Sequence, residues 1–107
     1  MVDGVRNGPK GAPRRPTVKL RFSEQAVRDR RRLAAFLADR NPRAALRAFQ
    51  AITQSVSLLP RTPFMGREKE DHRELYIRFG DSGYVVQYRV DADAVVVARI
   101  FHAREDR

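Results

Sequence analysis

Residues 73–101 read RELYIRFGDSGYVVQYRVDADAVVVARIF and carry the pattern that decides the fold. Three strand-length runs rich in Val, Ile, Tyr and Phe, separated by short turns that contain Gly or Asp, occupy residues 73–79, 84–90 and 94–101. Apolar and polar side chains alternate in the first two runs, as in strands with one buried face. The short turns bring consecutive strands back alongside each other. We therefore predict a three-stranded antiparallel meander.

The alternation also assigns the two faces of this meander. The side chains that we expect to face the core are Leu75, Ile77, Phe79, Tyr84, Val86, Tyr88, Val96, Ala98 and Ile100. Because successive side chains of a strand point to opposite faces, the other face receives Arg78, Arg89 and Arg99, one from each strand. Valines share that face, and such a mixed composition is typical of a binding surface. Three separately solvated arginines are the simpler explanation.

The residues before the meander predict one more strand and two helices. Residues 17–22 (TVKLRF) alternate like a strand, and Ser23 follows as a helix N-cap. A second helix starts at Asn41 and Pro42, which suit the N-cap and first-turn positions, and ends near Pro60. The predicted fold is α+β in the order β-α-α-β-β-β, with a helical hairpin packed on one face of a small, largely antiparallel four-stranded sheet.

Both predicted helices have an apolar stripe for that packing. The stripe of the first contains Ala26, Leu33, Phe36 and Leu37, and that of the second contains Ala45, Phe49, Ile52, Val56 and Leu59. Arg30 falls within the first stripe, where its stem can pack while its guanidinium reaches the rim or a partner. Residues 61–72 hold Pro63 and Gly66 among charged residues, which predicts a loop.

The amino-acid composition indicates which kinds of partner and site the chain can have. Its 22 Lys and Arg against 13 Asp and Glu give a formal net charge of +9 over 107 residues, which indicates an anionic partner, either nucleic acid or an acidic protein segment. There is no cysteine and there are only two histidines, so we predict neither a metal site nor a cofactor. No apolar run approaches a membrane span, and a cytoplasmic location is expected. Residues 1–16 are rich in Gly, Pro and Arg and predict a disordered basic tail before one domain at residues 17–107.

Several short motifs occur in a recognisable order along this domain. They are S-x-x-A-x-x-D from Ser23, N-P-x-x-A from Asn41, P-x-x-G-R from Pro63, R-E-L from Arg73, Y-x-V-x-Y-R-V from Tyr84 and H-A-R from His102. In this order and spacing they resemble toxins of the RelE/ParE superfamily, and the resemblance covers residues 18–104. It implies a compact toxin of a type II toxin–antitoxin system, neutralised by a cognate antitoxin and compatible with a heterotetramer or larger assembly. The helix arginines Arg28, Arg30 and Arg31 are candidate antitoxin contacts, although a solvated helix face is the default explanation for them.

The resemblance leaves the target open between two branches. RelE-like members are ribosome-dependent endoribonucleases that cut mRNA, which implies catalytic roles for Arg78, Arg104 and a titratable group such as His102. ParE-like members inhibit DNA gyrase. After Arg104 this sequence has none of the aromatic residues that RelE-like enzymes carry there. The residues of its R-E-L, Y-R-V and H-A-R motifs are also more similar to those of ParE-like members, so we favour gyrase as the target. A nontoxic nucleic-acid-binding domain on the same fold is the third hypothesis.

Overall fold

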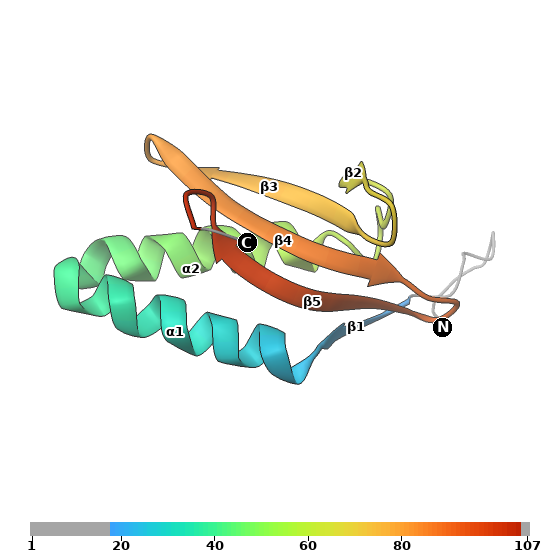
Figure 1. The fold of residues 1–107 in the computed structure, drawn as a ribbon, viewed down its shortest axis with the longest axis horizontal. Helices are drawn as coiled ribbons and strands as arrows, with labels where there is room; N and C mark the ends of the chain where they lie inside the picture. The colour runs from blue at the N-terminus through green and yellow to red at the C-terminus, as the bar shows by residue number, and fades with distance from the viewer. Residues whose placement is uncertain (1–17, 106–107) are drawn as a thin grey trace, which may run out of the picture.

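The computed structural model describes residues 18–105, which form two helices and one sheet (Figure 1). The elements in chain order are β1 (Lys19–Phe22), α1 (Glu24–Arg40), α2 (Pro42–Ser57), β2 (Arg67–Glu68), β3 (Arg73–Phe79), β4 (Ser82–Val90) and β5 (Ala94–His102). The predicted α+β class and the β-α-α-β-β-β order are confirmed. The tail predicted at residues 1–16 lies outside the described residues.

The sheet has five strands in the order β1-β5-β4-β3-β2, and not four as predicted. The additional strand, β2, pairs antiparallel with β3 and lies inside the segment that we expected to be a loop. It has only two residues, which is too short for any alternation to show in the sequence. The meander β3-β4-β5 is antiparallel, whereas β1 joins β5 in parallel and closes the other side.

The helical hairpin forms where its caps predict. The Ser23 hydroxyl accepts a hydrogen bond from the Ala26 N–H at 3.0 Å, and the Asn41 side chain accepts one from the Ala44 N–H at 3.1 Å. Both helices lie on the same face of the sheet (Figure 1). Neither helix, within the part of the chain that the structure describes, is long and apolar enough to cross a membrane.

The core lies between this hairpin and the sheet. Its largest fully buried side chains include Tyr88, Leu59, Ile100 and Val86. The predicted stripe of α2 is confirmed at Ile52 and Val56, which are almost fully buried. The stripe of α1 is wrong at Phe36, which is 54% exposed near the end of the hairpin, while Asp29 on the same helix is buried.

A β-bulge in β5 overturns part of the face assignment. Gln87 pairs with Arg99 but the next residue, Tyr88, pairs with Val97, so Ala98 has no partner opposite it. One extra residue reverses the parity of the strand, and Val95 and Val97 therefore belong to the core, fully buried. Val96 and Ala98, which we expected to face the helices, are only partly buried. Ile100, beyond the bulge, faces the helices as predicted.

Candidate functional site

The outer face of the sheet, turned away from the helices, is the predicted binding surface. Tyr76 on β3 pairs with Val85 on β4, which pairs with Phe101 on β5, and these side chains form an apolar row across the face. One row further, Arg78 pairs with Gly83, and the Gly83 carbonyl accepts a hydrogen bond from the Ala103 N–H at 2.9 Å. The segment after β5 thus lies beside the β3-β4 turn.

Arg78 and Arg104 consequently come to the same end of the sheet, which we call the cationic end. Arg78 is exposed on β3, and Arg104 is exposed in the turn after β5. The two residues are far apart in the chain, and the pairing of β3 with β4 and of β4 with β5, extended by the Ala103–Gly83 hydrogen bond, brings their segments together. Both guanidinium groups add positive charge to this end of the sheet.

His102 is placed differently from the two arginines. It pairs with the core residue Tyr84, and its ring packs edge-on against the Tyr84 ring at 5.3 Å between centroids. Its Nδ1 accepts a hydrogen bond from the Arg104 N–H at 3.1 Å. Because paired residues share a face of the sheet, His102 points to the helix side and away from the outer face.

Arg99 binds a buried carboxylate. Its Nε donates to Asp29 Oδ2 at 2.8 Å and its Nη2 donates to Oδ1 at 3.2 Å, while its guanidinium also stacks on Phe101 at 4.5 Å. Asp29, with no exposed side-chain surface, also accepts from the Ile100 N–H at 2.8 Å and from Gln25 at 3.1 Å. This fork-to-carboxylate geometry gives Arg99 a structural role.

The same contacts set the ionisation of Asp29. Burial alone would raise the pKa of this carboxyl group, but the hydrogen bonds from Arg99 and the Ile100 N–H, helped by Gln25 and Arg32, lower it from 3.8 to about 2. The ion pair in turn raises the pKa of Arg99 above its usual value. Asp29 is therefore a carboxylate, and Arg99 a cation, throughout the physiological range.

Helix α1 also covers the edge of β5 that β1 leaves open. β1 pairs with β5 only as far as Val97, and beyond it Ser23 Oγ donates to the Ala98 carbonyl at 2.8 Å while Arg32 donates to the Ile100 carbonyl at 3.4 Å. Arg32 also forms an ion pair with Glu105, whose carboxylate accepts from the His102 N–H at 2.7 Å. The segment that carries Arg104 is thus tied to α1.

The remaining predicted arginines are exposed and do not converge. Arg28 donates to Gln25 at 3.0 Å on the surface of α1, and the guanidinium of Arg30 lies over the Phe22 ring at 5.1 Å. The neighbouring Arg31 is exposed on the same helix. Arg89 is exposed on β4, opposite Val96 and toward the other end of the outer face from Arg78. The helix arginines and the sheet arginines therefore belong to separate surfaces.

Sequence reasoning missed Tyr76. Its ring is 54% exposed and lies across Gly83, where an added Cβ would approach its hydroxyl oxygen to 2.9 Å. A hollow of about 530 Å³ on the outer face is lined by Arg67, Lys69, Glu74, Tyr76, Val85 and Ala103. Tyr76 is two positions from Arg78, so the alternation of residues 73–79 places both on the outer face. This alternation could have identified Tyr76 as a candidate site residue.

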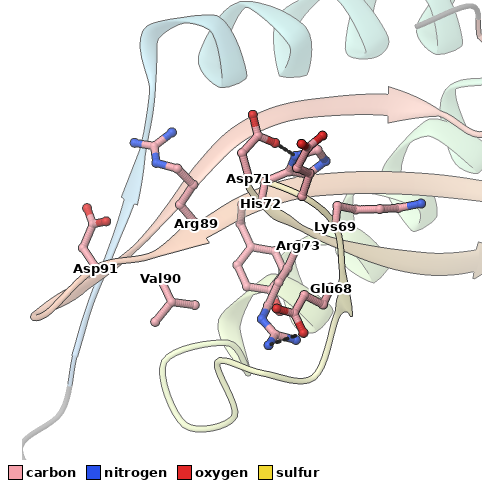
Figure 2. Close-up of a pocket in the computed structure, with 10 residues that line it drawn as sticks. Glu68, Lys69, Asp71, His72, Arg73, Arg89, Val90 and Asp91 are labelled. Atoms are coloured by element: carbon pink, nitrogen blue, oxygen red, sulfur yellow. Dashed lines mark hydrogen bonds and ion pairs between the residues drawn. The ribbon is translucent and has the colours of Figure 1, made fainter.

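A second hollow of about 310 Å³ lies where β2, β3 and the end of β4 meet (Figure 2). His72 is held between two carboxylates there, with Nδ1 at 2.6 Å from Asp71 and Nε2 at 3.3 Å from Glu74. The hydrogen bond to Asp71 raises the pKa of His72 above 6.5, against the effect of partial burial. Figure 2 also shows Arg73 extending toward Glu68, which it approaches to 3.9 Å.

Comparison with known proteins identifies the family. Residues 20–107 match the family model described as "ParE toxin of type II toxin-antitoxin system, parDE". The chain belongs to this toxin family. This ParE-family toxin is 46% identical over 89 residues to Toxin RelE3 of Caulobacter vibrioides, across 82% of the chain and 97% of the relative. It is 38% identical over 92 residues to Toxin RelE1 of the same organism, across 85% of the chain and 99% of the relative.

Solved structures agree with the fold of this ParE-family toxin. A chain of the chromosomal ParDE system of P. aeruginosa superposes with a TM-score of 0.70 at 20% identity, over 82% of this chain and 98% of that one. A chain of the RelBE2 toxin–antitoxin complex of Mycobacterium tuberculosis gives 0.54 at 25% identity, over 81% and 99%. The predicted membership of the RelE/ParE superfamily is therefore confirmed, and a type II toxin is favoured over a nontoxic nucleic-acid-binding domain.

Proposed function

We propose that this toxin arrests growth by binding and inhibiting DNA gyrase, and that it does so without cutting nucleic acid. The observation that carries the proposal is the composition of the outer face beside the cationic end. Arg78 and Arg104 supply positive charge there, but β4, the strand between their elements, presents Gly83, Val85 and Gln87 outward. Gly83 has no side chain, and neither Val85 nor Gln87 can act as a general acid or base.

Cleavage of RNA without a metal needs more than positive charge. A base must activate the 2′-hydroxyl, and an acid must protonate the leaving oxygen. His102, the predicted titratable group, packs on Tyr84 and has its Nδ1 engaged by the Arg104 N–H. His72 lies in the hollow where β2 meets β3, between Asp71 and Glu74. The exposed phenol of Tyr76 is the group near Arg78 on which the endoribonuclease alternative depends. Because His102 points to the helix side and His72 lies in the other hollow, we favour a toxin that acts by occupying a surface of its target.

We further propose that a cognate antitoxin neutralises this toxin, in a heterotetramer or a larger assembly. The similar solved chains come from toxin–antitoxin systems, which supports such a partner. The net charge of +9 suits an acidic antitoxin segment, and the exposed arginines Arg28, Arg30 and Arg31 on α1 are candidate contacts. Arg89 and the exposed part of Arg99 are candidate contacts of the target on the outer face.

The test of the gyrase proposal is a supercoiling assay with purified gyrase and toxin, combined with induction of the toxin alone in bacteria. We expect loss of supercoiling in vitro, and loss of plasmid supercoiling before loss of translation in cells. Arg78→Ala should weaken inhibition by roughly 10-fold, a loss expected for a charged interface contact. Arg47→Ala, an exposed arginine on α2, is the matched control. Intact supercoiling at toxin excess contradicts the proposal.

The alternative is ribosome-dependent cleavage of mRNA, and one observation favours it. Tyr76 lies one row from Arg78 on the outer face, so a phenol hydroxyl and a cation are neighbours there. The two curated relatives are also called RelE. In a translating extract this alternative predicts cleavage of message that Tyr76→Phe and Arg78→Ala both abolish. Intact message at toxin excess rejects it.

A further inference from the structure

We propose that the loop of residues 58–66 is an anchor that inserts into the cognate antitoxin, and we call this segment the anchor loop. Its sequence LPRTPFMG after Leu58 leads from α2 to β2. Phe64 is 64% exposed, Met65 is 43% exposed and Leu58 is 49% exposed. Three large apolar side chains in nine residues are thus presented to solvent. Phe64 is the most exposed of the large apolar side chains in residues 18–105.

The anchor loop is held in this conformation by buried groups. The Tyr88 hydroxyl, in the core, donates to the Pro63 carbonyl at 2.8 Å and accepts from the Gly66 N–H at 2.8 Å. Arg73 donates to the Gly66 carbonyl at 2.8 Å and to the Phe64 carbonyl at 3.3 Å. A Cβ on Gly66 would come within 2.7 Å of the Tyr88 hydroxyl, so the loop approaches the core closely.

These contacts fix the backbone of the anchor loop and leave the side chains at its tip, Phe64 and Met65, exposed to solvent. The Arg73 guanidinium lies over the Phe64 ring at 4.9 Å, which fixes the ring without burying it. A loop that served only to connect α2 with β2 would not need a rigid backbone under an exposed Phe and Met. Preorganised aromatic and Met side chains beside arginine are the usual composition of a protein-binding hot spot.

Charge around the anchor loop indicates the kind of partner. Arg61 lies inside the loop, Arg67 follows it directly and Arg73 lies beneath it, so three cations border the apolar tip. The partner that fits is a segment with an apolar pocket for Phe64 and acidic residues around that pocket, opposite the three cations. The residence time of such a complex depends mainly on desolvated apolar anchors, and Phe64 and Met65 are exposed apolar side chains of this kind. We therefore assign the anchor loop to the antitoxin.

The anchor loop is separate from the cationic end. Arg73 and Arg78 lie at opposite ends of β3, about 17 Å apart at about 3.4 Å per residue. The proposal thus rests on the proposed cognate antitoxin and is independent of gyrase as the target. Antitoxin can be anchored at one end of the sheet while the target contacts the other.

The experiment measures the affinity and dissociation rate of purified cognate antitoxin on the full-length toxin and its variants. Phe64→Ala should raise Kd by about 10-fold to 100-fold, the range of a hot-spot truncation, mostly through faster dissociation. Leu46→Ala is the matched control, because Leu46 is 63% exposed on α2 and is no part of the anchor loop or of the candidate contacts on α1. This control should change Kd by less than about 3-fold.

Growth assays distinguish the antitoxin from other occupants of the anchor loop. Phe64→Ala should still arrest growth without antitoxin, and should need more antitoxin for rescue. An unchanged Kd, or an equal rise in Leu46→Ala, overturns the proposal. So does loss of growth arrest with Kd intact, which would assign the loop to the target. Loss of toxin self-association with Kd intact would overturn it as well, because the occupant would then be a second toxin chain.

Discussion

Asp29 is the residue whose chemistry most constrains the structure. Five donor groups surround it, and those of Arg99 and Ile100 are contributed by β5, about 70 positions further along the chain. Removing one partner of a buried ion pair leaves the other uncompensated. The sequence marks Asp29 only as part of the S-x-x-A-x-x-D motif, and the pairing with Arg99 depends on a contact between distant segments.

Asp29→Asn should lower the free energy of unfolding by about 2–3 kcal/mol at pH 7, because Asn keeps the shape but loses the charge. The folded pKa of Asp29, about 2, lies below its unfolded value of 3.8, so its contribution is complete above about pH 4 and is lost as the pH falls toward 2. Denaturant melts across this range should show the gap between wild type and variant closing. Asp39→Asn, exposed on the same helix, is the control, and a gap independent of pH would contradict this account.

Tyr88 has a similar role at the other end of the sheet, where its hydroxyl is bonded to the anchor loop. Tyr88→Phe should cost about 2 kcal/mol, because the buried Gly66 N–H loses its acceptor and the Pro63 carbonyl loses a donor. Tyr76→Phe removes the same atom from an exposed ring and should change stability by less than about 0.5 kcal/mol. Urea denaturation measures both, and equal effects would mean that the hydroxyl of Tyr88 contributes nothing specific.

Among the elements, the helices were the most predictable from sequence. Ser23, Asn41 and Pro42 determine helix starts through local hydrogen bonds and a fixed φ, and these signals need no knowledge of distant contacts. Strand β5 was predicted with the wrong parity before its bulge. Its run VVVA is apolar in both phases, so nothing in the sequence shows where the extra residue is inserted.

The same limits apply to the candidate site. Parity placed Arg78 and Arg89 correctly on the outer face, because β3 and β4 pair without interruption around Arg78 and alternate clearly. Arg99 lies beyond the bulge and binds Asp29 on α1. Alternation within a strand cannot reveal a partner on a helix. The anchor loop was predicted as a loop, while its rigid backbone depends on the contact of Pro63 and Gly66 with Tyr88, over 20 residues away.

Ser23 joins two elements and offers a test at this scale. Its hydroxyl caps α1 through the Ala26 N–H and donates to the Ala98 carbonyl at the bulge of β5. Ser23→Ala should therefore destabilise the fold by about 1–2 kcal/mol, toward the upper end for loss of a cap. Ser57→Ala, at the exposed end of α2, should cost less than about 0.5 kcal/mol. Thermal melts compare the two variants, and equal losses would show that the link to β5 is unimportant.

At the scale of the whole molecule, charge and apolar anchoring have different distributions. Exposed arginines are spread over both helices and the sheet, whereas Phe64 and Met65 are concentrated in one rigid loop. Long-range attraction accelerates encounter with an acidic antitoxin and is screened by salt, while buried apolar contacts determine how long the complex lasts. Association and dissociation should therefore respond to different changes.

Raising NaCl from 50 mM to 500 mM shortens the screening length from about 14 Å to about 4 Å, and we expect the association rate of toxin and antitoxin to fall by at least about 10-fold. The dissociation rate should change by less than about 3-fold, because anchors buried in the complex are shielded from salt. Phe64→Ala should show the converse, with faster dissociation at an association rate close to that of wild type. Stopped-flow or surface-binding kinetics at both salt concentrations measure the association and dissociation rates of wild type and variant. If salt acted mainly on dissociation, ion pairs within the interface, and not the anchor loop, would hold the antitoxin in place.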